Sequence, residues 1–237
     1  MMKAVILAGG RGQRLAPYTT ILPKPLMPIG DVPILEVVVR QLKRAGFEDI
    51  TLAVGYLAEL LMAYFGDGQK LGVRIHYSRE EEPLGTAGPL ALIRGLDEPF
   101  LVMNGDLLTT LDYARLWQAH AARQAIATLV TFQRNVQIDL GVIETDEEGR
   151  VRGYIEKPTY HYTVSTGIYV FEPAVLRYVT PLARLDLPEL ILKLLAGGQE
   201  VAAYPFRGTW LDIGRIDDYQ QAVDEFTRRR SEFLPEG

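Results

Sequence analysis

The chain of 237 residues contains no cysteine and only three histidines. Without cysteine there are no disulfides, thiolate zinc sites, iron–sulfur clusters or cysteine nucleophile. The same absence is typical of a reducing compartment, so we expect a cytoplasmic protein. No stretch reaches the roughly 20 apolar residues of a membrane span. The first apolar run, residues 4–8, stops at Gly9 and Gly10, which makes it too short for a signal peptide.

The chain also has fewer basic than acidic residues. The chain has 25 Lys and Arg against 30 Asp and Glu, which gives a net charge of -5. A mildly acidic protein has no overall field that would hold nucleic acid, so any phosphate must bind at a local site. The basic run at residues 227–230 ends an expected helix, where cations complement the helix dipole. We therefore expect no nucleic-acid partner and no membrane contact, and the sequence leaves a homo-oligomer open.

Hydrophobic residues make up 48% of the chain, enough for a large core. In the first half, short apolar strands alternate with helices, a pattern typical of a mostly parallel, Rossmann-like sheet with helices on both faces. In the second half, two strands flank the turn residues 146–149 and indicate a hairpin. We expect one α/β domain over residues 1–237, with this antiparallel insertion as a lid over the sheet's carboxyl edge, where ligands bind. The expected strands are residues 3–8, 49–54, 73–77, 99–103, 126–132, 140–144, 151–156, 165–171 and 201–205, and the expected helices are residues 34–45, 57–65, 86–94, 112–123, 187–196 and 216–230.

The strongest motif, LAGGRGQRL at residues 7–15, follows the first expected strand. Its glycines let backbone N–H groups approach phosphate oxygens. Arg11 and Arg14 add positive charge, and Lys24 follows between two stiffening prolines. The combination suits a polyphosphate. The motif lacks the Gly-Lys-Ser/Thr of a Walker A loop and the third glycine and strand-end acid of a dinucleotide fingerprint. Read alone, it could also be a plain turn with solvated arginines.

Two aspartates lie just beyond expected strands. Asp106 follows the apolar segment 99–103, and Asp212 lies in the segment WLDIG at residues 210–214. Either one alone could be a turn or N-cap residue. Together they suit magnesium, which proteins hold with one or two carboxylates while phosphate oxygens and water complete the shell.

These segments resemble, in the same order, the sugar-1-phosphate nucleotidyltransferases, and most of all catalytic domains of the bacterial mannose-1-phosphate guanylyltransferase type. The resemblance covers nearly the whole chain. It rests on five segments, namely the glycine loop, PKPL at 23–26, GD at 105–106, EKP at 156–158 and WLDIG at 210–214. One departure is Gln13, which stands where the family usually has threonine. We also expect no C-terminal β-helix of hexapeptide repeats, which many members of the family carry.

The resemblance implies transfer of a nucleoside monophosphate from a nucleoside triphosphate to a sugar 1-phosphate, with Mg²⁺ as cofactor and pyrophosphate as product. It implies that Arg14 and Lys24 stabilise charge at the reacting phosphorus, and that Asp106 and Asp212 hold the metal. The implied nucleotide-binding residues are Leu7, Ala8, Gly9, Gly10, Gly12, Gln13, Pro83, Gly85, Thr86, Ala87 and Gly105. The implied sugar-phosphate-binding residues are Gly141, Glu156, Lys157, Thr166 and Gly167.

The base and the sugar stay open at this stage. Small residues at 84–88 resemble purine-using relatives, which favours GTP with mannose 1-phosphate. Uridylyl or thymidylyl transfer to glucose 1-phosphate or N-acetylmuramic acid 1-phosphate needs the same catalytic set. A non-catalytic regulatory relative would usually lack Arg14, Lys24, Asp106 or Asp212, and all four are present. A dinucleotide-dependent oxidoreductase is disfavoured because no acid closes the second strand.

Overall fold

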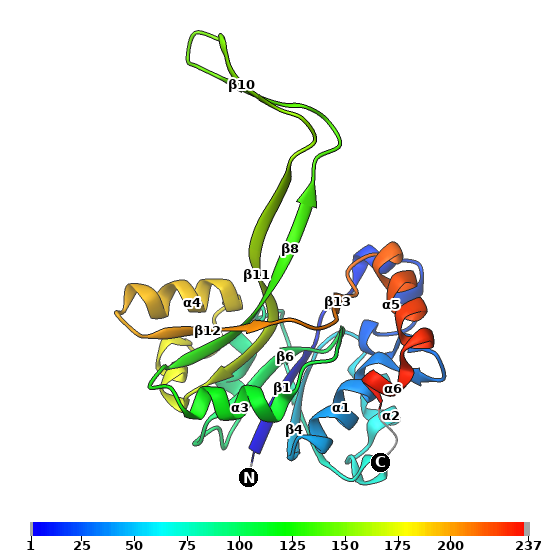
Figure 1. The fold of residues 1–237 in the computed structure, drawn as a ribbon. Helices are drawn as coiled ribbons and strands as arrows, with labels where there is room; N and C mark the ends of the chain where they lie inside the picture. The colour runs from blue at the N-terminus through cyan, green and yellow to red at the C-terminus, as the bar shows by residue number, and fades with distance from the viewer. Residues whose placement is uncertain (1, 235–237) are drawn as a thin grey trace.

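The computed structural model describes residues 2–234, and its centre is a seven-stranded sheet (Figure 1). The strands, in their order across the sheet, are β12 (Val201–Phe206), β8 (Ala127–Gln137), β11 (Thr159–Phe171), β6 (Phe100–Asn104), β1 (Met2–Ala8), β4 (Phe47–Val54) and β5 (Arg74–Arg79). Strand β11 runs antiparallel to β6 and β8, while the other neighbours are parallel. The expected mostly parallel α/β sheet is confirmed.

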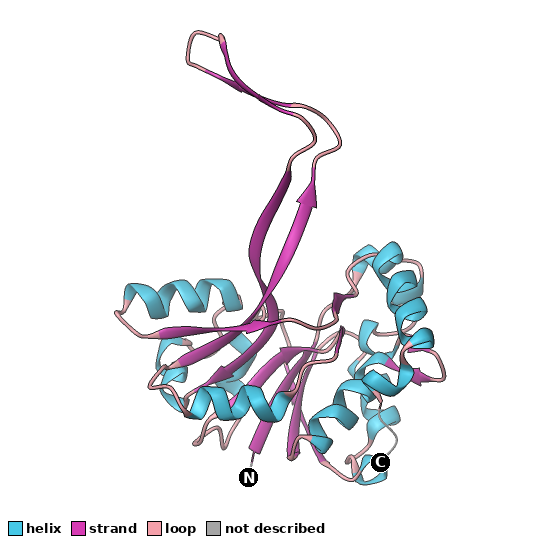
Figure 2. Ribbon diagram, in the orientation of Figure 1, coloured by secondary structure: helices cyan, strands magenta, loops and turns pink. Residues whose placement is uncertain are grey.

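Helices cover both faces of this sheet (Figure 2). The α-helices are α1 (Ile34–Arg44), α2 (Ala58–Phe65), α3 (Tyr113–Ala121), α4 (Leu187–Ala196), α5 (Ile216–Arg228) and α6 (Arg230–Phe233). Alternation along β1 explains the two layers, because successive side chains of a strand point to opposite faces. Ile6 packs in the cluster that holds α1, α2 and α3, and its neighbour Val5 packs in the cluster that holds α4. Within residues 2–234, no helix is long and apolar enough to cross a membrane.

A third apolar cluster fixes the loops that carry the site. Phe226 of α5 and Phe233 of α6 pack with Ile34 of α1, and the same cluster includes Leu15 and Ile213. All five side chains are at most 1% exposed. Leu15 adjoins Arg14 and Ile213 adjoins Asp212, so two buried side chains anchor the backbone beside two of the expected site residues.

The remaining elements are short. The small strands are β2 (Pro28–Ile29) with β3 (Val32–Pro33), and β7 (Leu107–Thr109) with β13 (Trp210–Asp212). The 3₁₀ turns are η1 (Gln13–Leu15), η2 (Tyr18–Thr20), η3 (Lys24–Leu26), η4 (Gln69–Leu71), η5 (Gly88–Leu92) and η6 (Pro173–Tyr178). The expected helix at 86–94 was wrong and is only the turn η5. The N–H groups of Leu90 and Ile93 donate to the carbonyl oxygens of Ala87 and Leu90, three residues earlier, so the segment forms a 3₁₀ turn and not an α-helix.

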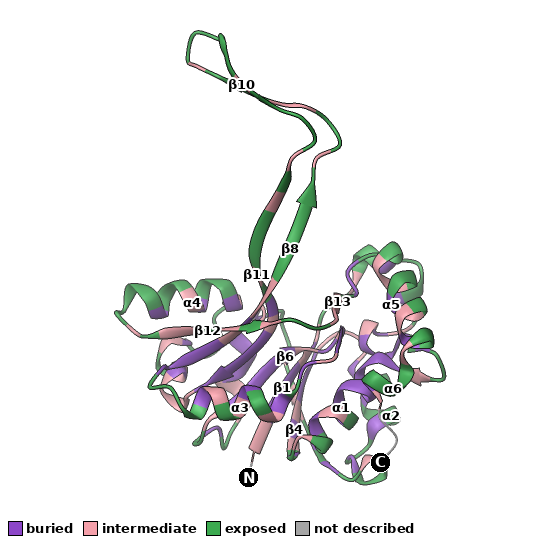
Figure 3. Ribbon diagram, in the orientation of Figure 1, coloured by how far each residue is buried: buried purple, intermediate pink, exposed green. Residues whose placement is uncertain are grey.

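The hairpin of the second half is the largest departure from expectation. Strands β8 and β11 run on beyond the sheet, and β9 (Val142–Thr145) and β10 (Val151–Ile155) form a small two-stranded sheet at their end. We call residues 131–165 the arm, its seven residue pairs from Thr131↔Ser165 to Gln137↔Thr159 the stalk, and residues 138–158 the tip. The antiparallel insertion exists as expected. However, it projects away from the body and is largely exposed, instead of lying over the sheet edge (Figures 1 and 3).

Candidate active site

The carboxyl ends of β1, β4, β5 and β6 meet at one edge of the sheet, and a cavity of about 1380 Å³ opens there. We call this cavity the cleft. It brings together much of what the sequence predicted. The predicted residues that line it are Leu7, Ala8, Gly9, Gly10, Gly12, Gln13, Arg14, Lys24, Pro83, Gly85, Thr86 and Asp106. Its position agrees with the rule that open α/β sheets bind ligands beyond their strands' carboxyl ends.

The glycine loop enters the cleft because its glycines allow close approach. Gly12 has φ +60°, a left-handed conformation, and a β-carbon there would lie 2.9 Å from Thr19. The Thr19 hydroxyl donates to the Gly12 carbonyl oxygen over 2.8 Å and holds the turn. A β-carbon on Gly9 would lie 2.7 Å from Oε1 of Glu80. Small residues at these positions therefore leave the loop backbone facing the cavity, as a phosphate cradle requires.

Lys24 and Asp106 meet at the bottom of the cleft as an ion pair between Nζ and Oδ2. Lys24 begins turn η3 with a proline on either side, and its side chain is only 11% exposed. Asp106 follows Gly105, whose N–H donates to the carbonyl oxygen of Leu7 over 3.0 Å and ties β6 to β1. The other carboxylate oxygen of Asp106, Oδ1, is buried and has no hydrogen-bond partner in residues 2–234. Such an atom is costly to bury, so it needs a partner that is not part of the chain.

Asp212 lies beside this ion pair. It ends strand β13, which pairs with β7 in the register Asp212↔Leu107. Partial burial, and next the nearby Asp106 carboxylate, raise the pKa of Asp212 above its ordinary value, although Lys24 and Arg14 act in the opposite direction. A pair of neighbouring carboxylates is a suitable place for a cation.

The two aspartates fit magnesium only if the substrate completes the shell. Among residues 2–234, no group of three or more histidine, aspartate or glutamate side chains is placed to hold a metal. Magnesium is usually held by one or two carboxylates with phosphate oxygens and water as the other ligands. The unpartnered oxygen of Asp106 and the crowded Asp212 match that arrangement.

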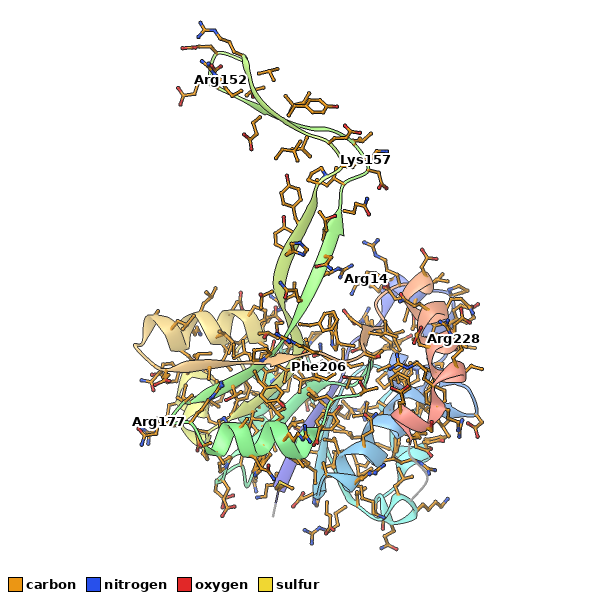
Figure 4. All side chains as sticks on the ribbon, in the orientation of Figure 1. Arg14, Arg152, Lys157, Arg177, Phe206 and Arg228 are labelled. Atoms are coloured by element: carbon orange, nitrogen blue, oxygen red, sulfur yellow. The ribbon has the colours of Figure 1, made fainter. Side chains whose placement is uncertain are left out.

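Arg14 reaches the same region from the glycine loop. Its guanidinium nitrogens lie 3.6 Å from where a β-carbon on Gly214 would stand, and Oδ2 of Asp218 lies 3.4 Å from that point. Arg14 therefore lies against Gly214, two residues beyond Asp212. Figure 4 shows Arg14 at the upper edge of the body, below the arm. Arg14, Lys24 and Asp106 thus line the cleft, and Asp212 lies close enough to feel the charge of all three.

The loop expected to contact the base is fixed to helix α4. The Thr86 hydroxyl accepts the N–H of Leu187 over 2.7 Å, and the Thr86 N–H donates to Asp186 over 3.0 Å. Gly85 has φ +79°, and a β-carbon there would lie 2.6 Å from the Leu185 carbonyl oxygen. The Thr86 hydroxyl therefore already serves the start of α4. Ala87 is fully buried and does not line the cleft, so the neighbouring backbone and Pro83 are the groups left to contact a base.

The residues expected to bind the sugar phosphate fall into two places. Thr166 and Gly167 are in β11 next to Asn104, a cleft residue. The Thr166 hydroxyl is buried and bonded to the Val130 carbonyl oxygen, and a β-carbon on Gly167 would lie 2.6 Å from Asn104. Gly141, Glu156 and Lys157 are on the arm and do not line the cleft. Figure 4 shows Lys157 far above Arg14. The structure does not bring the two groups together, and their role with sugar stays a prediction.

Glu80 is a cleft residue that the sequence did not reveal. It belongs to a run of three acids at 80–82, and all three residues line the cavity. Glu80 Oε2 accepts the N–H of Leu84 over 3.0 Å, and its other oxygen faces Gly9 and Gly55. Its position just after β5 was the available signal, because the carboxyl ends of parallel strands meet at one edge.

Comparison with known proteins places this arrangement in a family. The chain matches the nucleotidyl transferase family over residues 3–229. The chain belongs to that family. It is 37% identical over 242 residues to the UTP–glucose-1-phosphate uridylyltransferase of Synechocystis, which covers 94% of this chain and 62% of that protein. It is 35% identical over 243 residues to the mannose-1-phosphate guanylyltransferase catalytic subunit beta of Danio rerio, which covers 99% of this chain and 67% of the subunit.

Solved structures share the fold of this nucleotidyl transferase family member. A protein from Bacillus anthracis named as a glucose-1-phosphate thymidylyltransferase superposes with a TM-score of 0.77 at 26% identity, and the match covers 94% of each chain. HddC from Yersinia pseudotuberculosis, in a complex with GMP-PN, has a TM-score of 0.72 at 24% identity, with 95% of this chain and 100% of that chain covered. The chain spans about two thirds or less of the two curated relatives' lengths.

Proposed function

We propose that this protein transfers a nucleoside monophosphate from a nucleoside triphosphate to a sugar 1-phosphate. One observation supports this above all, which is that Arg14, Lys24 and Asp106 line a cleft whose wall is a glycine loop, and Asp212 lies close enough to feel the charge of all three. Two cations and two carboxylates suit a triphosphate with its metal ion. Relatives named for uridylyl and guanylyl transfer carry sugar 1-phosphates in their names as well.

The reaction needs positioning and charge stabilisation more than acid–base chemistry. A phosphate oxygen of the sugar 1-phosphate, already anionic at neutral pH, attacks the α-phosphorus. The new O–P bond forms as the bond to the β-phosphate oxygen breaks, and the electron pair leaves with pyrophosphate. Arg14 and Lys24 stabilise the charge that shifts toward the leaving group. Asp106 and Asp212 would hold magnesium, which supplies charge neutralisation when bound.

For the nucleotide we propose GTP, with mannose 1-phosphate as the acceptor. Several relatives at 34–36% identity are named mannose-1-phosphate guanylyltransferases. The cleft, with a volume of about 1380 Å³, also has room for a purine nucleotide. The second candidate is uridylyl transfer to glucose 1-phosphate, which the Synechocystis relative favours at 37% identity.

A matrix of substrates tests both the type of reaction and the choice of base and sugar. Each of GTP, UTP, dTTP and ATP is combined with mannose, glucose and N-acetylmuramic acid 1-phosphates, and pyrophosphate release is followed with and without magnesium. We expect magnesium-dependent release, with kcat/KM for GTP about 10-fold or more above that for UTP, a difference of about 1.4 kcal/mol. A clear preference for UTP or dTTP contradicts the choice of base, and no release in any combination contradicts the reaction itself. Lys24→Ala serves as the inactive control.

A further inference from the structure

The arm separates two charged side chains from the rest of the site. Glu156 and Lys157 lie directly beyond the stalk, whose seven residue pairs make it about 20 Å long at the usual rise of a strand. Both side chains are exposed. Asp106 and Arg14, in contrast, belong to the body below (Figure 4). The cleft of one chain therefore lacks the groups on the arm of that same chain.

Bending of the tip cannot bring Glu156 and Lys157 back to the cleft of their own chain. The bend is closed by the N–H of Ile138, which donates to the carbonyl oxygen of Pro158 over 3.0 Å, and Lys157 adopts φ +44° there. Glu156 and Lys157 sit at the bend itself, so rotation of the tip leaves them at the top of the stalk. Only a collapse of the stalk ladder would carry them down to their own cleft.

The tip also exposes apolar surface that a free two-stranded ribbon cannot cover. Leu140 is 73% exposed, Ile143 54%, and Val151 and Tyr154 63% each. A lone pair of strands is marginal in water, and clustered apolar side chains usually mark a contact surface. The tip is nevertheless ordered internally, because the Tyr154 hydroxyl lies over Gly141 and donates to Glu156 over 3.1 Å.

A matching surface borders the cleft. Tyr18 is 53% exposed and Ile21 78% on the segment that follows Arg14, and Ile216 at the start of α5 is 47% exposed. The charges of the tip and of the glycine loop favour a contact between these two surfaces. Residues 138–158 hold six acids and three bases, a net charge of -3, while the glycine loop holds Arg11 and Arg14. The loop beside α5 and the arm lie on the same side of the body (Figure 1).

We propose that two copies of this chain form a two-fold dimer in which each arm reaches across to the other copy and places Glu156 and Lys157 at that copy's cleft. A two-fold axis uses the same pair of surfaces twice, so both tips are covered and both sites are completed. The assignment of the arm to the sugar phosphate rests on the proposed function. The sugar half of each site then belongs to a different chain from the nucleotide half.

Cross-linking tests the exchange without any assay of activity. Because the chain has no native cysteine, Ile21→Cys and Leu140→Cys variants can be made separately, mixed, and treated with a short bis-maleimide. We expect a covalent species of twice the chain mass that is much stronger in the mixture than in either variant alone. The double variant is the control for an arm that folds back on its own body. Cross-links confined to single chains, no cross-link at all, or a monomeric mass by light scattering would each overturn the exchange.

Complementation tests what the exchanged arm does. Lys24→Ala disables the cleft, and Glu156→Ala weakens sugar binding at the arm, so activity is assayed at a sugar 1-phosphate concentration well below KM. When the two variants are mixed and allowed to exchange subunits, half of the dimers are mixed, and one of the two sites in each is intact. We expect activity to recover to about a quarter of the wild-type value. Activity no higher than the sum of the separate variants overturns the assignment. If the wild-type protein itself shows no turnover, the proposed function fails, and the cross-linking result still decides the exchange.

A pair of surface variants locates the contact. Ile21→Glu puts a charge on the surface beside Arg14, and Leu192→Glu puts one at a 65% exposed site on α4. We expect Ile21→Glu to weaken the dimer at least about 10-fold, as the burial of an unpaired charge predicts. Leu192→Glu should leave the dissociation constant unchanged, as measured by sedimentation. Equal dissociation constants for the two variants would contradict the proposed docking surface.

Discussion

The body and the arm solve the problem of holding a charged substrate in different ways. In the body, Lys24 and Asp106 are fixed by buried neighbours, so the nucleotide end of the cleft is formed within a single chain. On the arm, Gly141, Tyr154 and Glu156 lie at the tip, where most of the described side chains are exposed. Rigid elements support precise catalytic geometry, while exposed segments suit binding that waits for a partner. The difference suggests that charge stabilisation is built into the fold and that sugar binding is added by assembly.

The largest effect should come from the body. Asp106→Asn removes the carboxylate that pairs with Lys24 and leaves one fewer charged oxygen for a metal. We expect kcat to fall by about 10²-fold or more, as for other lost transition-state charge contacts. Steady-state kinetics over a range of magnesium concentrations measure this. Glu148→Gln, which removes an exposed carboxylate from the arm, is the matched control and should keep full activity. Near-normal turnover of Asp106→Asn at limiting magnesium would contradict the role of Asp106.

A substitution on the arm should change KM for the sugar 1-phosphate instead of kcat. Glu156→Ala removes a carboxylate expected to bind sugar hydroxyls in both the ground and the transition state. We expect KM for the sugar 1-phosphate to rise about 10-fold, a cost of about 1–3 kcal/mol, while KM for the nucleotide and kcat change little. Each substrate is varied in turn, again with Glu148→Gln as the control. If the nucleotide KM rises and the sugar KM does not, the division between body and arm is wrong.

A third prediction compares stability instead of activity. Thr86→Val removes the hydroxyl that accepts the N–H of Leu187 at the start of α4. We expect the free energy of unfolding to fall by about 1–2 kcal/mol, because a helix-capping acceptor is lost. Thr163→Val, on the exposed stalk, should change it by no more than about 0.5 kcal/mol. Urea denaturation gives both values. Equal stability of the two variants would mean that the base-side loop is held by its backbone bonds alone.

The same contrast governs what the sequence could predict. Helix α4 begins and ends where its periodicity indicated, and β1 differs from expectation by one residue. These elements follow local rules of pattern and capping. The direction of the arm does not, because alternating residues in a hairpin are equally compatible with a closed lid and with an extended arm. Its position depends on contacts outside the hairpin, and those are invisible in a local pattern.

Site residues were predictable where a motif places them at the end of a buried strand. Arg14, in the loop after β1, and Asp106, just after β6, line one cleft for that reason. Glu80 was missed because it stands in an acidic run that is typical of a solvated turn, and only the neighbouring strands bring it against Gly9. Thr86 was expected to bind the nucleotide, but α4, about 100 residues later in the chain, takes its hydroxyl. Contacts between distant segments, rather than propensity, decided both cases.

The smallest expected effect concerns two histidines, one in each region. His120 is 2% exposed on α3, and its Nδ1 lies 2.8 Å from the Thr128 hydroxyl. Burial lowers the pKa of His120 below its ordinary value, although Glu172, whose Oε1 lies 3.3 Å from Nε2, acts in the opposite direction. His161, in contrast, lies exposed on the arm beside Asn135.

A lowered pKa in the folded state has a definite consequence for stability. The folded protein then binds fewer protons than the unfolded chain, so stability is lost as pH falls from about 6.5 through the lower folded value. His120→Gln removes this loss. We expect its unfolding free energy, relative to wild type, to improve by up to about 1 kcal/mol between pH 7.5 and pH 5, whereas His161→Gln should follow wild type throughout. Urea denaturation at several pH values measures the difference. If His120→Gln instead loses more stability than wild type at pH 5, the ion pair with Glu172 outweighs burial, and the interior of the body tolerates this charge as readily as the arm does.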